Sequence, residues 1–264
     1  MKRLIKNAIV GRQWSQRFFT KLLGISLEGL NMVGAGRGPQ TWGEAWAIKY
    51  VLSKSRANPV VFDAGAQGGD YMNEILNISP TCTIYAFEPA KRAFIKLQEI
   101  FQNHPNINLI NIALGAENTT TPLFSSEGVD GVDSLYKLPD TKANHFVVSR
   151  EVHVSTINGF CKDRGISYID LLKLDIEGGE LAALKGAETM IKEETISFIQ
   201  FEHSNASFYA GYRFKEIFDL LSPHYRIYRI LRHGLTKILE PSALQDLPFA
   251  VNYLAESRKI KERL

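Results

Sequence analysis

The residues best suited to chemistry lie in one short stretch, where an apolar run ends in an acid and glycines follow. The run is Val60-Val61-Phe62, the acid is Asp63, and the glycines are Gly65, Gly68 and Gly69. Glycines let the backbone turn sharply and let a ligand approach it without a Cβ in the way. A helix after the turn would direct free N–H groups at that ligand. The stretch therefore predicts a ligand site, with an ordinary tight turn between strand and helix as the alternative.

A second acid stands where a nucleoside site needs one. Residues 83–87 form another short run typical of a strand, and Glu88 follows it, 23 residues after Gly65. In dinucleotide-type folds an acid about 20 residues beyond the glycines accepts hydrogen bonds from ribose hydroxyls. Strand, glycines, helix, strand and acid together favour an adenosine-containing cofactor.

The glycine spacing and the first acid narrow the choice of cofactor. A nicotinamide site needs Gly-x-Gly-x-x-Gly, and a phosphate loop ends in Gly-Lys-Ser/Thr. Here the glycines are Gly65-x-x-Gly68-Gly69 and Asp70 follows, so neither pattern is met. An acid two residues before the first glycine suits a cationic amino group rather than phosphate, as in S-adenosylmethionine.

Four ordered motifs carry a family resemblance. They are Asp63–Tyr71, Phe87-Glu88-Pro89, Asn111-Ile112-Ala113-Leu114-Gly115 and Lys173–Glu180. At these motifs the chain resembles the FkbM family of S-adenosylmethionine-dependent methyltransferases, over roughly residues 60–205. Gln67 stands where the family usually has Asn, and it keeps the amide group.

The resemblance implies a Rossmann-like class I methyltransferase fold and a set of cofactor contacts. It implies that the methionine end is held by Asp63, Gly65, Gln67 and Gly69, and that Tyr71 and Asp175 also contact the cofactor. The ribose is expected at Glu88 and Pro89, and the adenine beside Asn111 and Ala113. A Gly-Glu pair ahead of the first strand is common in the family, so Glu44 is expected near the cofactor's amino group or the substrate. The product would be S-adenosylhomocysteine, and the family suggests a hydroxyl of a sugar, glycan or small-molecule natural product as acceptor.

Three residues that end predicted strands form the candidate catalytic group: Asp175, Glu202 and His203. Methyl transfer to oxygen is an in-line displacement, which needs alignment within about 3 Å and benefits from a general base. His203 is the first choice for the base because an imidazole titrates near neutral pH, with His153 second and a structural histidine as the alternative. Asp175 is expected to orient the substrate or the methionine end. No metal site is predicted, although Asp175 with Glu202 as ligands of a divalent cation is the minority interpretation.

The elements that position these residues alternate along the chain. Strands are predicted at 59–64, 83–88, 107–113, 168–175, 196–202, 225–231 and 249–255. Helices are predicted at 69–78, 90–103, 155–164, 178–193 and 212–221. The pattern predicts an α/β fold with a seven-stranded, mostly parallel sheet, helices on both faces and ligands at the carboxyl ends of the strands. Residues 115–154, with short strands near 123–124, 132–135 and 151–154, form an insertion that we expect to face the substrate.

The segments outside this pattern are an N-terminal extension, residues 1–40, and a tail, residues 259–264, around a methyltransferase domain at 41–258. Residues 2–23 hold six basic residues, no acid, and apolar residues near helical spacing, too interrupted for a secretion signal. Such a helix can lie on an anionic membrane surface, but most amphipathic helices pack on protein, on their own domain or on a second subunit. Thr41 and Glu44 have the spacing of a capping box that opens a helix through Leu52.

Composition limits the remaining classes. A net charge of +3 is too small to indicate nucleic-acid binding, and no run of about 18 apolar residues predicts a membrane span. Cys82 and Cys161 have no metal spacing, which favours free thiols in a reducing compartment and hence a cytoplasmic protein, with peripheral membrane contact and a homo-oligomer as open alternatives. An NAD-type oxidoreductase and a non-catalytic binding or scaffold protein are the competing functions.

Overall fold

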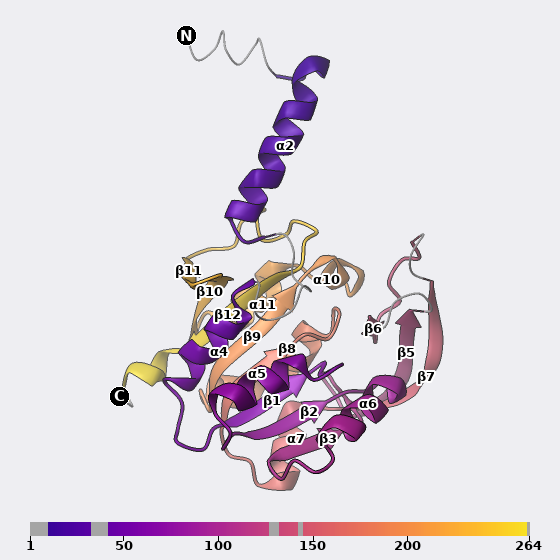
Figure 1. The fold of residues 1–264 in the computed structure, drawn as a ribbon, viewed down its shortest axis with the longest axis vertical. Helices are drawn as coiled ribbons and strands as arrows, with labels where there is room; N and C mark the ends of the chain where they lie inside the picture. Colours follow the sequence, from indigo (N-terminus) through magenta and orange to yellow (C-terminus); the bar gives the residue numbers. More distant parts are fainter. Residues whose placement is uncertain (1–9, 33–41, 127–131, 142–144, 263–264) are drawn as a thin grey trace.

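The computed structural model describes residues 10–32, 42–126, 132–141 and 145–262. Its main feature is an eight-stranded sheet in the order β11-β10-β12-β9-β8-β1-β2-β3 (Figure 1). The strands are β1 (Val60–Ala64), β2 (Thr83–Phe87), β3 (Ile107–Ile110), β8 (Ile169–Leu174), β9 (Ile196–His203), β10 (Tyr225–Leu231), β11 (Gly234–Ile238) and β12 (Val251–Ser257). In the described part of the chain, no helix is long and apolar enough to span a membrane.

The sheet confirms the predicted α/β fold. β1, β2, β3, β8 and β9 are parallel, and β12 is antiparallel to β9 and β10. The prediction had seven strands; the eighth is β11, which forms a hairpin with β10 at the sheet edge. The strand predicted at 107–113 ends at Ile110, and the chain then leaves the sheet.

Two layers of helices cover the sheet. One face carries α4 (Glu44–Leu52), α5 (Asp70–Ile78) and α6 (Lys91–Phe101), and the other carries α7 (Ile157–Arg164), α8 (Glu180–Lys185), α9 (Glu188–Lys192) and α11 (Phe214–Leu221). Because successive side chains of a strand point to opposite faces, each strand contributes residues to both cores. Val61 packs with α4 and α5, whereas Phe62 packs against Phe160 of α7. Because both faces are covered, β8 is buried from end to end and β1 from Val61 onward.

The predicted insertion forms a second sheet, in the order β4-β7-β5-β6. Its strands are β4 (Ala113–Leu114), β5 (Thr119–Ser126), β6 (Asp133–Ser134) and β7 (Phe146–Ser155). β5 and β7 are longer than the short strands predicted there, and β6 is shorter. The small sheet packs through Leu123, Val152 and Val154 on Ala90, just before α6. It stands beside α6 and β3 in Figure 1, next to the edge where the carboxyl ends of β1 and β2 meet.

Two predicted helices differ in detail. The helix predicted at 178–193 is interrupted between α8 and α9, where Gly186 lies so close to the loop after β4 that a Cβ would stand 2.0 Å from the carbonyl oxygen of Gly115. α4 begins at Glu44 with Gly43 as its N-cap, at φ +96°, and no side chain caps it. Thr41, the predicted cap, lies outside the described residues. Thr156 caps α7, accepting a hydrogen bond from the N–H of Gly159.

The N-terminal helix and the C-terminal tail each contact the domain over a short stretch. Helix α2 (Gln13–Gly29) projects away from the body (Figure 1), and the residues just after it anchor it. Met32 is fully buried, and the Asn31 side chain donates to the carbonyl oxygens of Trp42 and Ile230 at 3.0 and 3.1 Å. The predicted tail begins as a 3-10 helix, η1 (Arg258–Glu262), in which Ile260 is buried.

The loop that leads into β1 is fixed by a buried carboxylate of β8. Asp170 is 1% exposed and accepts a hydrogen bond from the Val60 N–H at 2.8 Å. It also receives the Arg56 guanidinium, Nη2 to Oδ2, at 2.7 Å. This clamp holds the first strand, and hence the glycine turn after it, in register with β8.

We expect Asp170→Ala to lower the free energy of unfolding by about 2–3 kcal/mol, since it removes charge-assisted hydrogen bonds and leaves a strand N–H unpaired. Urea unfolding followed by circular dichroism measures the change. The matched control is Asp219→Ala, which removes an exposed i,i+4 pair with Lys215 and should cost less than about 0.5 kcal/mol. Equal losses in the two variants would contradict the role given to Asp170.

Candidate active site

The turn after β1 needs glycine at two positions. Gly65 has φ +79°, and a Cβ there would stand 1.8 Å from the carbonyl oxygen of Asp175. Gly69, at φ +84°, is the N-cap of α5, and its Cβ would collide with the Phe101 ring at 2.3 Å. Gln67 lies between them, also at positive φ. The turn is thus packed tightly against Asp175 and Phe101, and its opposite side is left to a ligand.

Glu88 holds that turn in place from the end of β2. One carboxylate oxygen accepts from the N–H of Gln67 at 2.9 Å, the other from the N–H of Ala90 at 2.8 Å. Burial raises the pKa of Glu88 to about 7 against the effect of these two bonds. A carboxylate oxygen has more than one acceptor site, so Glu88 can still receive ribose hydroxyls while it positions the turn.

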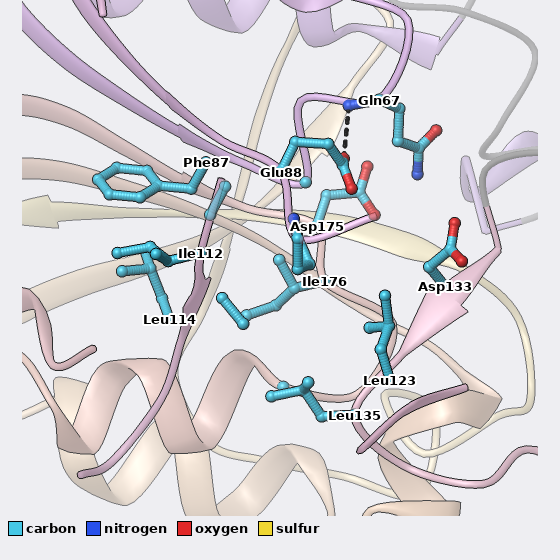
Figure 2. Close-up of a pocket in the computed structure, with 15 residues that line it drawn as sticks. Gln67, Phe87, Glu88, Ile112, Leu114, Leu123, Asp133, Leu135, Asp175 and Ile176 are labelled. Atoms are coloured by element: carbon cyan, nitrogen blue, oxygen red, sulfur yellow. Dashed lines mark hydrogen bonds between the residues drawn. The ribbon is translucent and has the colours of Figure 1, made fainter. Parts of the chain in front are cut away.

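A pocket lies between this turn and the small sheet, with about 510 Å³ of empty space that is open to solvent. In Figure 2, Gln67, Glu88, Asp175 and Asp133 lie along the upper and right side of the pocket, and apolar side chains lie to the left of them and below. The apolar lining consists of Phe87, Ile112, Leu114, Leu123, Leu135 and Ile176. The pocket therefore combines a slot for a flat, apolar ring system with a polar, acidic end.

Behind the acidic end lies Lys173, which sequence reasoning did not single out. Its Nζ lies 3.2 Å from Oδ1 of Asp63 and 3.5 Å from Oδ2 of Asp175, and it sits over the Tyr71 ring. Burial lowers the pKa of Lys173, but Asp63, Asp175 and Glu44 outweigh it and raise the pKa overall. The available signal was a lysine in a strand whose other residues are apolar except Asp170. The strand register then places Lys173 opposite Asp63.

A chain of hydrogen bonds links Tyr71, the residue under Lys173, to Glu44 in the N-terminal part of the domain. The Tyr71 hydroxyl donates to Gln200 at 2.8 Å, and the Gln200 amide donates to Glu44 at 3.0 Å. Burial raises the pKa of Glu44 to about 7. Glu44 therefore titrates near neutral pH, beside a site that already holds several carboxylates.

More carboxyl groups converge after β8 and β9. Glu177 lies in the loop after β8 at φ +49°, and burial together with Asp175 raises its pKa to about 8. Burial and the same carboxylates raise the pKa of Glu202 well above its ordinary value. Within the residues described, no group of three or more His, Cys, Asp and Glu side chains is arranged to hold a metal ion.

The structure separates His203 from this acidic group. Successive side chains of a strand point to opposite faces, so Glu202 shares a face with Gln200 while His203 faces the other core. There His203 packs on Phe208, Tyr212 and Phe214, and burial lowers its pKa.

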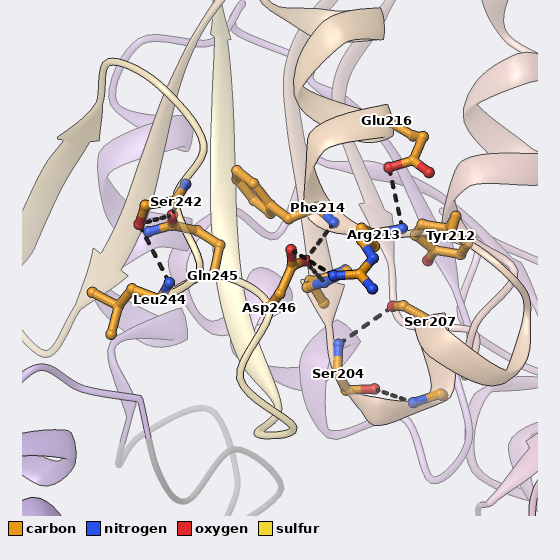
Figure 3. A network of polar contacts seen from close by, with 12 residues as sticks. Ser204, Ser207, Tyr212, Arg213, Phe214, Glu216, Ser242, Leu244, Gln245 and Asp246 are labelled. Atoms are coloured by element: carbon orange, nitrogen blue, oxygen red, sulfur yellow. Dashed lines mark hydrogen bonds and ion pairs between the residues drawn. The ribbon is translucent and has the colours of Figure 1, made fainter.

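The partner of His203 is Asp246, 3.5 Å from its Nε2. Asp246 also accepts from the N–H of Phe214 at 3.0 Å and lies beside Arg213 (Figure 3). This network joins β9, α11 and the loop before β12. His153, the second candidate base, is exposed on β7 and contacts Thr120.

The predicted cofactor residues thus divide into two groups. Those that line the pocket are Gly65, Gln67, Glu88, Pro89, Ala113 and Asp175. Asp63, Gly69, Tyr71 and Glu44 lie behind or beside this lining. Asn111 braces it: its amide donates to the carbonyl oxygen of Glu88 at 2.7 Å, and its oxygen accepts from Arg150 at 2.9 Å.

These features fit an adenosyl ligand with a cationic end. The slot between Ile112 and Leu123 suits the adenine, Glu88 suits the ribose hydroxyls, and the Gly65 turn offers backbone without a Cβ. The excess of carboxylates over Lys173 suits a positive charge at the far end.

Sequence comparison agrees with this geometry. Residues 63–230 match the family model described as Methyltransferase FkbM domain. The match covers more than half of the chain, so the chain belongs to the FkbM family of S-adenosylmethionine-dependent methyltransferases.

Individual relatives are distant. The 2-O-methyltransferase NoeI of Sinorhizobium fredii is 25% identical over 179 residues, which cover 63% of this chain and 72% of that protein. The methyltransferase sdnD of Sordaria araneosa is 24% identical over 168 residues, 53% of this chain and 64% of that one. Among solved structures, the putative methyltransferase SMU.1697c of Streptococcus mutans, in complex with SAH, aligns with a TM-score of 0.45 at 9% identity over 81% of this chain and 97% of its own.

We expect Glu88→Gln to weaken binding of S-adenosylhomocysteine at least about tenfold, because an amide cannot accept from Gln67, Ala90 and ribose hydroxyls at once. Isothermal titration measures the affinity. Glu99→Gln, an exposed position on α6, is the matched control and should bind as the wild type does. Unchanged binding by Glu88→Gln would remove Glu88 from the ribose site.

The affinity for S-adenosylmethionine should rise about tenfold from about pH 6 to about pH 8, since the cation favours the ionised form of groups that titrate near 7. We expect Glu44→Gln to bind about fivefold more weakly at the upper pH and to show a flatter dependence, because one of these groups no longer ionises. Titrations across this range, with exposed Glu240→Gln as control, measure both effects. An unchanged slope in Glu44→Gln would show that Glu44 does not sense the ligand.

Proposed function

We propose that this methyltransferase acts on oxygen and that its acceptor is a hydroxyl of a sugar or glycan. The observation that carries the choice of oxygen is the set of carboxyl groups with raised pKa, Glu44, Glu177 and Glu202, that surround Asp175 of the cofactor pocket. An alcohol is a weak nucleophile at neutral pH, and a base with a pKa near the working pH assists it best. The name of the relative NoeI, a 2-O-methyltransferase, supports the same choice.

Each residue has a distinct role in the proposed reaction. S-adenosylmethionine supplies a methyl group on a positively charged sulfur. Glu88 and the Gly65 turn bind the adenosyl part, and the negative potential of Asp63, Asp175 and Glu44 attracts the cationic end. Lys173 keeps these carboxylates in fixed positions, which preserves the alignment that an in-line displacement requires.

We propose that the base is a carboxylate of the acidic group rather than His203. Asp175 lines the pocket just after β8, Glu202 of β9 is close enough to feel the charges of Asp175 and Glu177, and Glu177 has a pKa of about 8. A base must be ionised to accept the hydroxyl proton. The fraction of Glu177 that can act as a base therefore increases as pH rises through 8. Glu202, whose pKa is raised well above its ordinary value, is better suited to hydrogen-bond the acceptor in its neutral form, and Asp175 to orient it.

The direct test is methyl transfer from radiolabelled S-adenosylmethionine to glycan pools and to small hydroxylated compounds, with NAD binding measured in parallel. We expect label in a carbohydrate fraction that survives mild alkali, as a methyl ether does and a methyl ester does not. Label that alkali releases would indicate a carboxyl acceptor. Cofactor binding without turnover on any pool would favour a binding or scaffold role, and binding of NAD alone would overturn the proposal.

Once an acceptor is known, we expect wild-type kcat to rise with pH toward about 8 and Glu177→Gln to lower it about a hundredfold and remove that rise. A pH profile of kcat measures both. Glu117→Gln, an exposed position before β5, is the matched control. If Glu177→Gln keeps the profile while His203→Gln loses it, the base is His203.

A further inference from the structure

Helix α2 carries an apolar stripe that the described part of the domain leaves uncovered. Trp14, Phe18, Leu22 and Ile25 recur every three or four residues and so lie along one face of the helix. They are 72%, 62%, 45% and 65% exposed. Figure 1 shows the helix reaching away from the body, with only its C-terminal end near the domain. A continuous apolar surface of this kind marks an interaction site.

The positive charge of the chain is concentrated in the same segment. Positions 1–27 hold six of the 31 basic residues and none of the 28 acidic ones, so this segment carries +6 and the rest of the chain −3. Within the described helix region, Arg17 and Lys21 stand four residues apart along one edge of the apolar stripe. An anionic surface would therefore attract the helix and repel the domain behind it.

We propose that α2 lies on an anionic lipid surface and holds the enzyme there as a peripheral membrane protein. The apolar stripe enters the boundary between headgroups and acyl chains, and the flanking basic residues contact the headgroups. Trp14 is an aromatic residue of the type that favours this boundary. A second copy of the chain is a poorer occupant, because pairing two such helices would bring together two segments of +6. The proposal is independent of the acceptor that the active site methylates.

Sedimentation of the full chain with vesicles tests the proposal. Vesicles of phosphatidylcholine alone are compared with vesicles of phosphatidylcholine and phosphatidylserine, at low and high salt. We expect the protein to pellet with the mixed vesicles, to stay in solution with phosphatidylcholine alone, and to be released by salt. Subtracting the emission spectrum of Trp14→Phe from that of the wild type isolates the fluorescence of Trp14. We expect this fluorescence to shift to shorter wavelength on the mixed vesicles, which locates the contact on α2.

Two double variants separate the electrostatic from the apolar part. Arg17→Gln with Lys21→Gln should weaken binding about thirtyfold, since each basic residue near such a surface gives roughly a fivefold gain. Phe18→Ser with Leu22→Ser should weaken it at least about tenfold, through loss of buried apolar area. Matched controls on the domain are Lys192→Gln with Lys215→Gln, and Val148→Ser with Leu239→Ser, which alter exposed side chains of the same kinds.

Several results would overturn the proposal. The helix does not bind lipid if wild type stays in solution with both kinds of vesicle, or if the control variants lose binding as the α2 variants do. Equal binding to both vesicles would remove the role of charge. A dimer in analytical ultracentrifugation that Phe18→Ser with Leu22→Ser dissociates, without vesicle binding, would make a second copy the occupant. Circular dichroism verifies that every variant is folded.

Discussion

The site depends on the ion pairs that the buried ammonium of Lys173 forms with two carboxylates. It lies between Asp63 at the end of β1 and Asp175 just after β8, at 3.2 and 3.5 Å. Desolvating three charges is costly unless they pair, and this arrangement pairs them across two neighbouring strands. The same pairing places Asp175 where its carbonyl oxygen closes off the space beside Gly65. Lys173 therefore positions the residue that packs against the glycine turn, and it also neutralises part of the negative charge beside the pocket.

The net charge of the group explains the direction of several titrations. One ammonium faces Asp63, Asp175 and Glu44, and further carboxyl groups stand nearby at Glu177 and Glu202. The surplus acids cannot all ionise cheaply in a buried site, so the pKa values of Glu44 and Glu177 are raised. For such groups the protonated form is favoured by folding. Their contribution to stability is present below the pKa of the unfolded chain and is lost as pH rises toward 7 and 8.

Much of the site follows from sequence because its residues lie at strand ends in short local patterns. Asp63, Gly65 and Glu88 were predicted from an apolar run, a turn and a spacing, and the structure brings them to one edge. Lys173 was missed because its meaning depends on the register between β1 and β8, which pairs it with Asp63. The break at Gly186 was missed for the same kind of reason: it depends on contact with Gly115, distant in sequence.

His203 shows how the alternation of side chains along a strand changes a chemical interpretation. Glu202 and His203 are adjacent in sequence, and their position at the end of a predicted strand places both near a ligand. The pleat of β9 sends Glu202 toward the acidic face and His203 into rings of the opposite core, where Asp246 meets it from the loop before β12. Strand parity can be derived from sequence once a neighbouring inward residue is known: Gln200 and Glu202 share a parity, and so do Phe201 and His203. Phe201 is buried among aromatic rings, so the parity of His203 already favours a structural histidine.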